Sequence, residues 1–177
     1  MLLIQITGLS GAGKTTLARL VKYELEALGH PVELIDGDEY RRHLCPDLGF
    51  SKADRLENIR RLGFVGLTLV KHGVITLLAA INPYEAARQA LTAQNPKVKT
   101  IFIDCPLAIL IERDTKGLYR KALLPEGHPD RVEHFTGISD PYEIPQNPHL
   151  TIHTHLENAE KSTKQIVDFI LKNIVKN

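Results

Sequence analysis

The stretch that decides the fold of this chain reads Gly8-Leu9-Ser10-Gly11-Ala12-Gly13-Lys14-Thr15. It matches the pattern G-x-x-x-x-G-K-[ST], whose glycines allow the backbone to wrap a phosphate and to point its N–H groups at it. In this pattern Lys14 reaches the β- and γ-phosphates of a nucleotide, and the hydroxyl of Thr15 binds Mg²⁺. The pattern needs a strand before it and a helix after it, and the helix adds the positive end of its dipole. The stretch therefore predicts a nucleotide-binding P-loop.

Strands and helices alternate along the chain on both sides of this loop. Short apolar runs predict buried strands, and apolar residues spaced three or four apart predict helices. The expected strands are 2–7, 32–35, 74–80, 99–104 and 149–154. The expected helices are 14–28, 51–72 (which Ser51 and Asp54 would cap), 83–94, a short one after Pro106, and 157–175. This order predicts an α/β P-loop NTPase fold, a five-stranded parallel sheet with helices on both faces.

One segment, residues 116–148, breaks the alternation because glycines and prolines replace the periodic apolar residues. Long irregular segments in compact domains are commonly lids or binding loops. Its first part, about residues 116–135, has few apolar anchors and carries the cations Lys116, Arg120, Lys121 and Arg131. We expect this part to be a mobile lid that closes over bound phosphates. The whole chain, residues 1–177, is expected to form a single domain.

Composition narrows the class of protein further. Hydrophobic residues make up 43% and charged residues 24% of the chain, which is ordinary for a soluble globular protein. The formal net charge of +1 gives no overall field that would attract nucleic acid or an acidic membrane, so neither is expected as a partner. The apolar run 1–6 is too short for a signal peptide, and we expect a cytoplasmic protein. The sequence does not determine the oligomeric state, and a homodimer is one of the possible states.

A P-loop alone does not identify the reaction. The N-K-x-D motif, with which switch GTPases read guanine, is absent from the chain. Asp36-Gly37-Asp38 follows the second expected strand, and ligands of open α/β sheets bind at the carboxyl ends of strands. Two carboxylates there can support Mg²⁺ and accept a proton from an acceptor hydroxyl, although Asp-Gly alone also fits a plain turn. A short chain with a long polar lid is the build of a small-molecule kinase.

Further blocks of sequence carry a resemblance to one family. They are Leu48-Gly49-Phe50-Ser51, Asp54-Arg55-Leu56-Glu57-Asn58-Ile59-Arg60-Arg61, Ile81-Asn82-Pro83-Tyr84, Lys116-Gly117-Leu118-Tyr119 and Phe135-Thr136-Gly137-Ile138. In this order and spacing, from Leu3 to about Thr154, the chain resembles the adenylylsulfate kinase family. The P-loop is shared by many families, but the other blocks together are highly specific.

The resemblance implies a reaction and its cofactor. The γ-phosphoryl group of MgATP would pass to the 3′-hydroxyl of adenosine 5′-phosphosulfate, with ATP as co-substrate. Asp38 would be the catalytic carboxylate beside Lys14, and Asp36 would support the magnesium that Thr15 binds. The implied ATP site consists of Gly8, Leu9, Ser10, Gly11, Ala12, Gly13, Lys14, Thr15, Thr16 and Arg113.

The resemblance also implies an acceptor site. Its members are Asp38; Arg41, Arg55 and Asn58, which would grip the phosphosulfate and ribose; Phe50 and Phe135, which would sandwich the adenine; Ile81 and Asn82, which would line the pocket through their backbone; and Lys116, which would come down with the lid. Arginine suits bidentate binding of oxyanions. Arg55 and Asn58 are three residues apart and share one helix face, whereas the roles of Arg60 and Arg61 stay open.

The chain departs from the family at two places. Asn82 stands where most members have a serine, which is phosphorylated in some of them. Because an asparagine cannot carry a phosphoryl ester, we expect direct transfer without a phosphoenzyme. Members usually have Ala-Arg soon after K-G-L-Y, but here Leu123 follows Ala122. The positive charge of that arginine either comes from Arg113, Arg120, Lys121 or Arg131 or is absent from this protein.

A P-loop protein of this size could also have one of two other functions. A related kinase with a different acceptor is disfavoured by the L-G-F-S and F-T-G-I blocks, which would build the adenine sandwich. A nucleotide-binding protein that no longer catalyses is disfavoured by the presence of Lys14, Thr15, Asp36 and Asp38.

Overall fold

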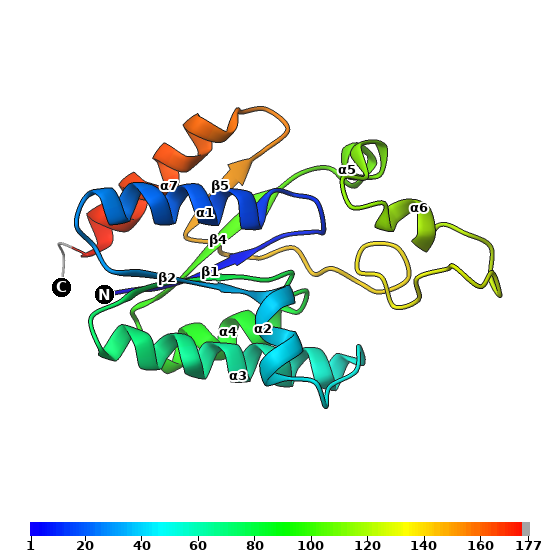
Figure 1. Cartoon of the computed structure of the whole chain (residues 1–177), viewed down its shortest axis with the longest axis horizontal. Helices are drawn as coiled ribbons and strands as arrows, with labels where there is room; N and C mark the ends of the chain where they lie inside the picture. Colours follow the sequence, from blue (N-terminus) through cyan, green and yellow to red (C-terminus); the bar gives the residue numbers. More distant parts are fainter. Residues whose placement is uncertain (175–177) are drawn as a thin grey trace.

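A five-stranded parallel sheet forms the centre of the molecule (Figure 1). The computed structural model describes residues 1–174. The strands are β1 (Leu3–Thr7), β2 (Val32–Asp36), β3 (Ile75–Ala79), β4 (Val98–Asp104) and β5 (Leu150–His153), and their order in the sheet is β2-β3-β1-β4-β5. All four pairings are parallel, and β1 lies in the middle between β3 and β4. The predicted α/β fold with a five-stranded parallel sheet is confirmed.

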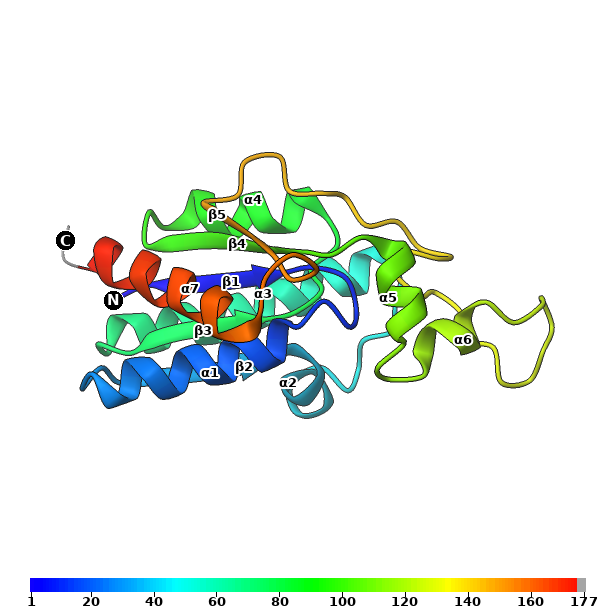
Figure 2. The same cartoon turned by 90° about the horizontal axis from the view of Figure 1, so that it is seen from above.

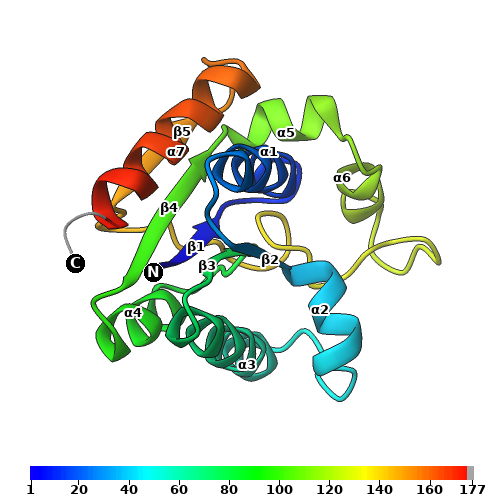
Figure 3. The ribbon, with the colours of Figure 1, turned by 60° about the vertical axis from the view of Figure 1, so that its left-hand side comes forward.

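Helices cover both faces of this sheet, as predicted. On one face lie α1 (Lys14–Ala27) and α7 (Ala159–Ile174), and on the other lie α3 (Lys52–Lys71) and α4 (Glu85–Gln94) (Figures 1 and 3). The short helices α2 (Gly37–Leu44), α5 (Leu107–Arg113) and α6 (Leu118–Ala122) gather at one end of the sheet (Figure 2). No helix in the described part of the chain is both long and apolar enough to cross a membrane.

The core consists of two apolar clusters, one on each face of the sheet. Along β1, Ile4 and Ile6 belong to the cluster under α1 and α7, whereas Leu3 belongs to the cluster under α3 and α4. This alternation follows from the two-residue period of a strand. Gln5 and Thr7 point to the same side as Leu3, and both are buried although they are polar. A central strand therefore presents two buried polar side chains toward α4.

Two helices were not predicted from the sequence. α2 begins directly after Asp36, whose Oδ1 accepts the backbone N–H groups of Asp38 at 3.0 Å and Glu39 at 3.3 Å. This side-chain cap stabilises the first turn although Gly37 lowers the local helix propensity. α6 lies inside the predicted lid and buries Tyr119 and Ala122, so the prediction of few apolar anchors is wrong for residues 118–122.

The predicted helix boundaries need small corrections. Ser51 caps α3 as predicted, since its hydroxyl oxygen accepts the N–H of Asp54 at 3.2 Å. α7 begins at Ala159 rather than at Glu157, because Asn158 accepts the N–H of Lys161 at 2.9 Å. The predicted end of this helix at Val175 lies outside the described residues.

Gly63 of α3 packs directly against Leu91 of α4, which gives a test of the packing. A methyl group at this position would overlap Cδ2 of Leu91, a side chain that is 2% exposed. Overpacking a core costs roughly 1–3 kcal/mol, more than the gain of about 1 kcal/mol in helix propensity from glycine to alanine. We predict that Gly63→Ala lowers the free energy of unfolding, measured by urea denaturation.

A double-mutant cycle supplies the control. Leu91→Ala alone should cost about 2–5 kcal/mol because it leaves a cavity. In the double variant the new methyl group occupies part of that cavity, so the combined loss should be smaller than the sum of the two single losses. Strictly additive losses would contradict the direct contact.

Candidate active site

The P-loop joins β1 to α1 at the carboxyl edge of the sheet. Gly8 packs so tightly on β4 that a Cβ there would stand 2.5 Å from the carbonyl oxygen of Ile103, so no other residue fits without displacing the loop. Within the loop, Lys14 Nζ donates to the carbonyl of Leu9 at 2.7 Å. The hydroxyl of Tyr119 in α6 donates to the carbonyl of Ser10 at 2.9 Å. The base of the predicted lid is thus tied to the P-loop.

Lys14 sits in an unusual electrostatic position. The pKa of its ammonium group is lowered from 10.5 to about 8, first by burial and then by the positive charge of Lys116, while the charges of Asp38 and Asp36 partly offset this shift. Burial disfavours the charged form because it removes water from the ammonium group. A bound phosphate would replace that lost solvation with direct negative charge.

Asp36 and Thr15 bring two side-chain oxygens together beside Lys14. The hydroxyl of Thr15 donates to Asp36 Oδ2 at 2.8 Å, while Asp36 Oδ1 caps α2. Mg²⁺ in nucleotide sites takes one or two protein oxygens and completes its shell with waters and phosphates. The donor set at Thr15 and Asp36 fits that requirement. Among residues 1–174 there is no cluster of three or more His, Cys, Asp or Glu that could hold a metal.

Asp38 lies in the first turn of α2 and pairs with the predicted lid. Its Oδ2 is 3.1 Å from Nζ of Lys116, and the two side chains are 78% and 52% exposed. Exposed ion pairs of this kind contribute little free energy. A ligand can therefore separate Lys116 from Asp38 at small cost.

A cavity of about 430 Å³ joins these groups to the predicted acceptor site. Its lining includes Ser10, Gly11, Gly13, Lys14, Thr15, Thr16, Asp36, Asp38, Phe50, Arg55, Ile81, Lys116 and Phe135. The predicted site residues outside its lining are Gly8, Leu9, Ala12, Arg41, Asn58, Asn82 and Arg113. Most of the predicted ATP and acceptor residues thus meet in one cavity, whose size suits a small-molecule site.

Phe50 is the open aromatic surface of this cavity. Phe50 is 57% exposed, and two guanidinium groups lie near its ring, that of Arg41 at 4.6 Å and that of Arg55 at 5.5 Å from the ring centroid. Arg41 also donates to the carbonyls of Leu48 and Gly49, which fixes the loop that carries Phe50. Cations over the face of the ring hold it in place.

Phe135, the second predicted stacking residue, lines the same cavity but is largely covered. It is 8% exposed, and its ring packs edge-on against Tyr119 with the centroids 5.0 Å apart. A sandwich between Phe50 and Phe135 requires the segment around Phe135 to present its ring to the cavity when the ligand binds.

Arg55 joins the Phe50 loop to the segment 134–140. It donates to the carbonyl of Phe50 at 2.9 Å, to the hydroxyl of Thr136 at 3.1 Å, to the carbonyl of His134 at 2.6 Å and to Asp140 Oδ2 at 3.0 Å. Its side chain is only 10% exposed. Arg55 is therefore held in position before any ligand arrives.

Two predicted acceptor residues lie behind the lining of the cavity. Asn58, one turn beyond Arg55 in α3, is 8% exposed, and its Oδ1 has no hydrogen-bond partner within residues 1–174. Asn82 is 4% exposed, and its amide group donates to Gln5 Oε1 at 3.2 Å. Its carbonyl is also engaged, by Arg88 at 2.6 Å. Ile81 lines the cavity and Asn82 does not, and the predicted contact through their backbone stays a prediction.

The remaining arginines take other positions. Arg60 forms a bidentate pair with Glu57, and Arg61 forms one with Asp47. Glu57 lies on α3 and Asp47 in the loop before it, so in the structure both arginines are paired with carboxylates of the protein. Arg113 is exposed at the end of α5, and its predicted contact with ATP stays a prediction.

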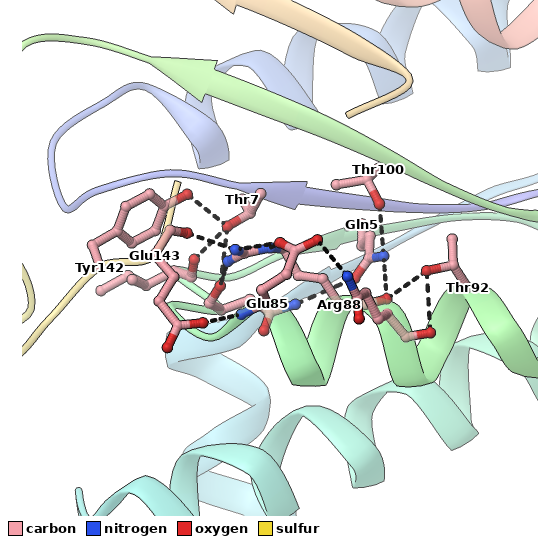
Figure 4. A network of polar contacts seen from close by, with 11 residues as sticks. Gln5, Thr7, Glu85, Arg88, Thr92, Thr100, Tyr142 and Glu143 are labelled. Carbon is pink, nitrogen blue, oxygen red and sulfur yellow. Dashed lines mark hydrogen bonds and ion pairs between the residues drawn. The ribbon is translucent and has the colours of Figure 1, made fainter. Parts of the chain in front are cut away.

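A network of polar residues behind the cavity was not predicted from the sequence (Figure 4). At its centre is Arg88 of α4, which is 2% exposed. The signal for it was present in β1, where Gln5 and Thr7 are polar residues in a central strand. Buried polar groups must find hydrogen-bond partners, so these two residues required polar partners in the segments packed against them.

Comparisons with known proteins agree with the geometry. The family model described as Adenylylsulphate kinase matches residues 1–153. An adenylyl-sulfate kinase of Synechococcus sp. (strain JA-3-3Ab) is 48% identical over 171 residues, 97% of this chain and 92% of the relative. One of Chloroflexus aurantiacus is 52% identical over 155 residues, 88% of this chain and 81% of the relative. The structure of a Mycobacterium tuberculosis APS kinase in complex with AMPPNP and APS is 37% identical, with a TM-score of 0.87 over 96% of both chains.

We predict that nucleotide binding takes up protons at pH 8.5. Lys14, with a pKa of about 8, is mostly neutral at that pH in the free protein. Bound phosphates raise its pKa because negative charge favours the ammonium form, so binding of MgADP should take up a fraction of one proton at pH 8.5, more than at pH 6.5. Isothermal titration calorimetry in buffers of different ionisation enthalpy measures this number.

The same titration at pH 6.5 is the control, because Lys14 is then protonated in both states and takes up no proton. Affinity for MgADP should fall as the pH rises above about 8, since only the protonated lysine pairs with phosphate. A binding enthalpy that is independent of the buffer at pH 8.5 would contradict the lowered pKa.

Proposed function

The chain belongs to the adenylylsulfate kinase family, and we propose that its cavity holds ATP and adenosine 5′-phosphosulfate together, so that one phosphoryl group passes directly between them. The reaction is the ATP-dependent phosphorylation of adenosine 5′-phosphosulfate to 3′-phosphoadenosine 5′-phosphosulfate. One observation carries the proposal: Lys14 and Thr15 line the same cavity as Phe50, Arg55 and Phe135.

The P-loop supports the ATP side. Its backbone N–H groups and the Lys14 ammonium would bind the β- and γ-phosphates. Thr15 and Asp36 would hold Mg²⁺, which when bound neutralises charge on the phosphates. Tyr119 keeps Ser10 in place through its carbonyl, so α6 helps to fix the loop around the phosphates.

Phe50 and two arginines support the acceptor side. The open ring of Phe50 offers a stacking surface to adenine, which every base can use through its π-face. Arg41 and Arg55 lie over that ring and place two positive charges next to the base. A phosphosulfate joined to the same nucleoside carries two negative charges, which would attract Arg41 and would compete with Asp140 for Arg55.

Asp38 would act on the acceptor hydroxyl. In the free protein Lys116 neutralises it, and this pair would separate when phosphates draw Lys116 toward them. The freed carboxylate then accepts a hydrogen bond from the 3′-hydroxyl and takes its proton as the oxygen attacks. The bond between the γ-phosphorus and the β,γ-bridging oxygen breaks as the bond to the 3′-oxygen forms.

Direct transfer agrees with the position of Asn82. Its side chain points away from the cavity to Gln5, and an amide oxygen is not a phosphoryl carrier. Asn82 therefore offers no nucleophile that could carry the phosphoryl group.

The proposal also covers the movement of the lid, the location of the protein and its oligomeric state. We expect the lid to move mainly beyond α6, where residues 123–131 project from the rest of the molecule (Figure 2). Residues 118–122 are held by the buried Tyr119 and should move less. A cytoplasmic location and a homodimer stay predictions from the sequence.

A panel of acceptors tests the proposed function. Release of ADP from MgATP should require adenosine 5′-phosphosulfate and should be weak with AMP, which lacks the sulfate. The matched control is 3′-deoxyadenosine 5′-phosphosulfate, which binds the same groups but has no hydroxyl to phosphorylate. Equal turnover with AMP, or turnover with the 3′-deoxy compound, would refute the assignment.

We predict that Asp38→Asn lowers kcat far more than it weakens ATP binding. The change keeps the size of the side chain and removes the charge that receives the proton. General acid–base catalysis contributes about a hundredfold or more to the rate. Steady-state kinetics together with MgADP titration measure both quantities. A collapse of nucleotide affinity with an unchanged kcat would place Asp38 in a different role.

We also predict that Phe50→Ala weakens binding of the acceptor nucleotide and leaves the affinity for ATP unchanged. Loss of one stacking surface costs roughly 1–3 kcal/mol of binding free energy. The control is Phe64→Ala, which removes another exposed phenylalanine (69% exposed) that does not line the cavity. If both nucleotides lose affinity equally, Phe50 supports the fold and not the acceptor.

A further inference from the structure

We propose that Arg88, which does not line the cavity, is a positioning residue that fixes the acceptor side of the active site relative to the P-loop (Figure 4). The inference rests on the proposed function, because it concerns where the acceptor lies. It goes beyond that function by assigning a role to a buried cation in α4, behind the site.

The guanidinium of Arg88 donates hydrogen bonds to three different segments of the chain. Nε and Nη2 donate to Glu85 Oε2 at 2.9 and 2.6 Å, within α4 itself. Nη1 donates to the carbonyl of Asn82 at 2.6 Å, and Nη2 also donates to the carbonyl of Glu143 at 2.5 Å. Two of these partners are backbone carbonyls, so the side chain fixes main chain in addition to its pair with the Glu85 carboxylate.

The two carbonyls belong to the two segments that form the acceptor side. Asn82 directly follows Ile81, which lines the cavity. Glu143 ends the segment that begins at Phe135 and Thr136, which also line it. Arg88 therefore stands behind both segments and holds them at one distance from each other.

Glu143 strengthens this junction with its own groups. Its N–H donates to the carbonyl of Pro83 at 2.8 Å, and its carboxylate accepts the N–H of Glu85 at 2.7 Å. Tyr84, the N-cap residue of α4, makes no side-chain cap hydrogen bond. The helix start is thus capped by a residue 58 positions away, which locks the segment to α4.

Thr7 connects the same junction to the P-loop, which begins at the next residue. Its hydroxyl donates to the carbonyl of Ile81 at 2.6 Å and therefore accepts from Tyr142, whose hydroxyl is 2.9 Å away. Burial raises the pKa of Tyr142 to about 12, so its hydroxyl keeps the proton that it donates. The start of the P-loop, the Ile81 turn and the Tyr142 segment are joined at one point.

Gln5 closes the network from within the sheet. Its amide nitrogen donates to the carbonyl of Arg88 at 3.1 Å and to the hydroxyl of Thr100 at 2.8 Å, while its oxygen accepts from Asn82. Both ends of Arg88, main chain and side chain, are therefore held. An apolar residue could fill such a space without the cost of burying a charge. The charge is better explained by the three-way bridge that only a forked guanidinium makes.

This bridge matters for transfer because the acceptor hydroxyl must meet the γ-phosphorus in line. Phosphoryl transfer depends mainly on the positions of its reactants. The P-loop sets the position of the donor, and the segments held by Arg88 set the position of the acceptor. Loosening the bridge should therefore affect the acceptor and the transfer step, and leave ATP binding unchanged.

The test compares Arg88→Lys with wild type and with Arg60→Lys, a matched change at an exposed arginine of α3. Lysine keeps the charge but cannot bridge a carboxylate and two carbonyls. We expect Arg88→Lys to lower kcat/KM for adenosine 5′-phosphosulfate by about a hundredfold, the loss that an ångström-scale misplacement of reacting groups causes. The KM for ATP and the affinity for MgADP should stay unchanged, and Arg60→Lys should match wild type in every parameter.

Tyr142→Phe keeps the inference testable if Arg88→Lys does not fold. This variant removes only the hydroxyl that donates to Thr7, and it should raise the KM for the acceptor several-fold without changing that for ATP. Thermal unfolding of each variant separates positioning from stability. Equal losses for both nucleotides, or a lowered Tm with wild-type kinetics, would overturn the inference. Failure of the wild type to phosphorylate adenosine 5′-phosphosulfate would instead refute the proposed function.

Discussion

Parallel pairing of β2, β3 and β1 is the constraint on which the site depends. These strands are neighbours in the sheet and run in one direction, so their carboxyl ends meet at one edge. Asp36 ends β2, the Ile81 turn follows β3, and the P-loop follows β1. Neighbouring strands lie about 4.8 Å apart, so three segments that are distant in sequence deliver a carboxylate, a cavity wall and a phosphate cradle within the length of one nucleotide.

The sheet brings these segments together, but hydrogen bonds at its edge fix them. Gly8 rests on the Ile103 carbonyl, and Thr15 is joined to Asp36. Thr7 and Arg88 then hold the turn after β3 and the segment that leads from Phe135 to Glu143. The donor and acceptor sides are thus linked through the interior of the protein, and not only through the ligands that they bind.

The local parts of this structure could be predicted from the sequence. The P-loop is contiguous, its glycines have a conformational reason, and the apolar periods on either side give the strands and helices. α2 was missed because Gly37 argues against a helix, whereas the Asp36 cap that starts it depends on backbone geometry. The fold of the lid base was missed because burial of Tyr119 requires a partner, the P-loop, more than a hundred residues away in sequence.

On the acceptor side, even less of the structure could be predicted from local sequence. The family resemblance assigns Phe50, Arg55, Ile81, Lys116 and Phe135 to the acceptor site, and in the structure all five line one cavity. The inward turn of Asn82 and the role of Arg88 depend on contacts among β1, β3, α4 and the segment around Glu143. No local pattern contains those contacts, and only the polar Gln5 and Thr7 in a central strand hinted at them.

The central claim is that one phosphoryl group passes directly from ATP to the 3′-oxygen of adenosine 5′-phosphosulfate within a single cavity. A rapid-quench experiment with [γ-³²P]ATP, enzyme in excess and the acceptor present measures this step in one turnover. The account predicts that the label passes from ATP to 3′-phosphoadenosine 5′-phosphosulfate with no labelled protein at any time. Label that appears first on the protein, or that leaves as inorganic phosphate, would contradict it.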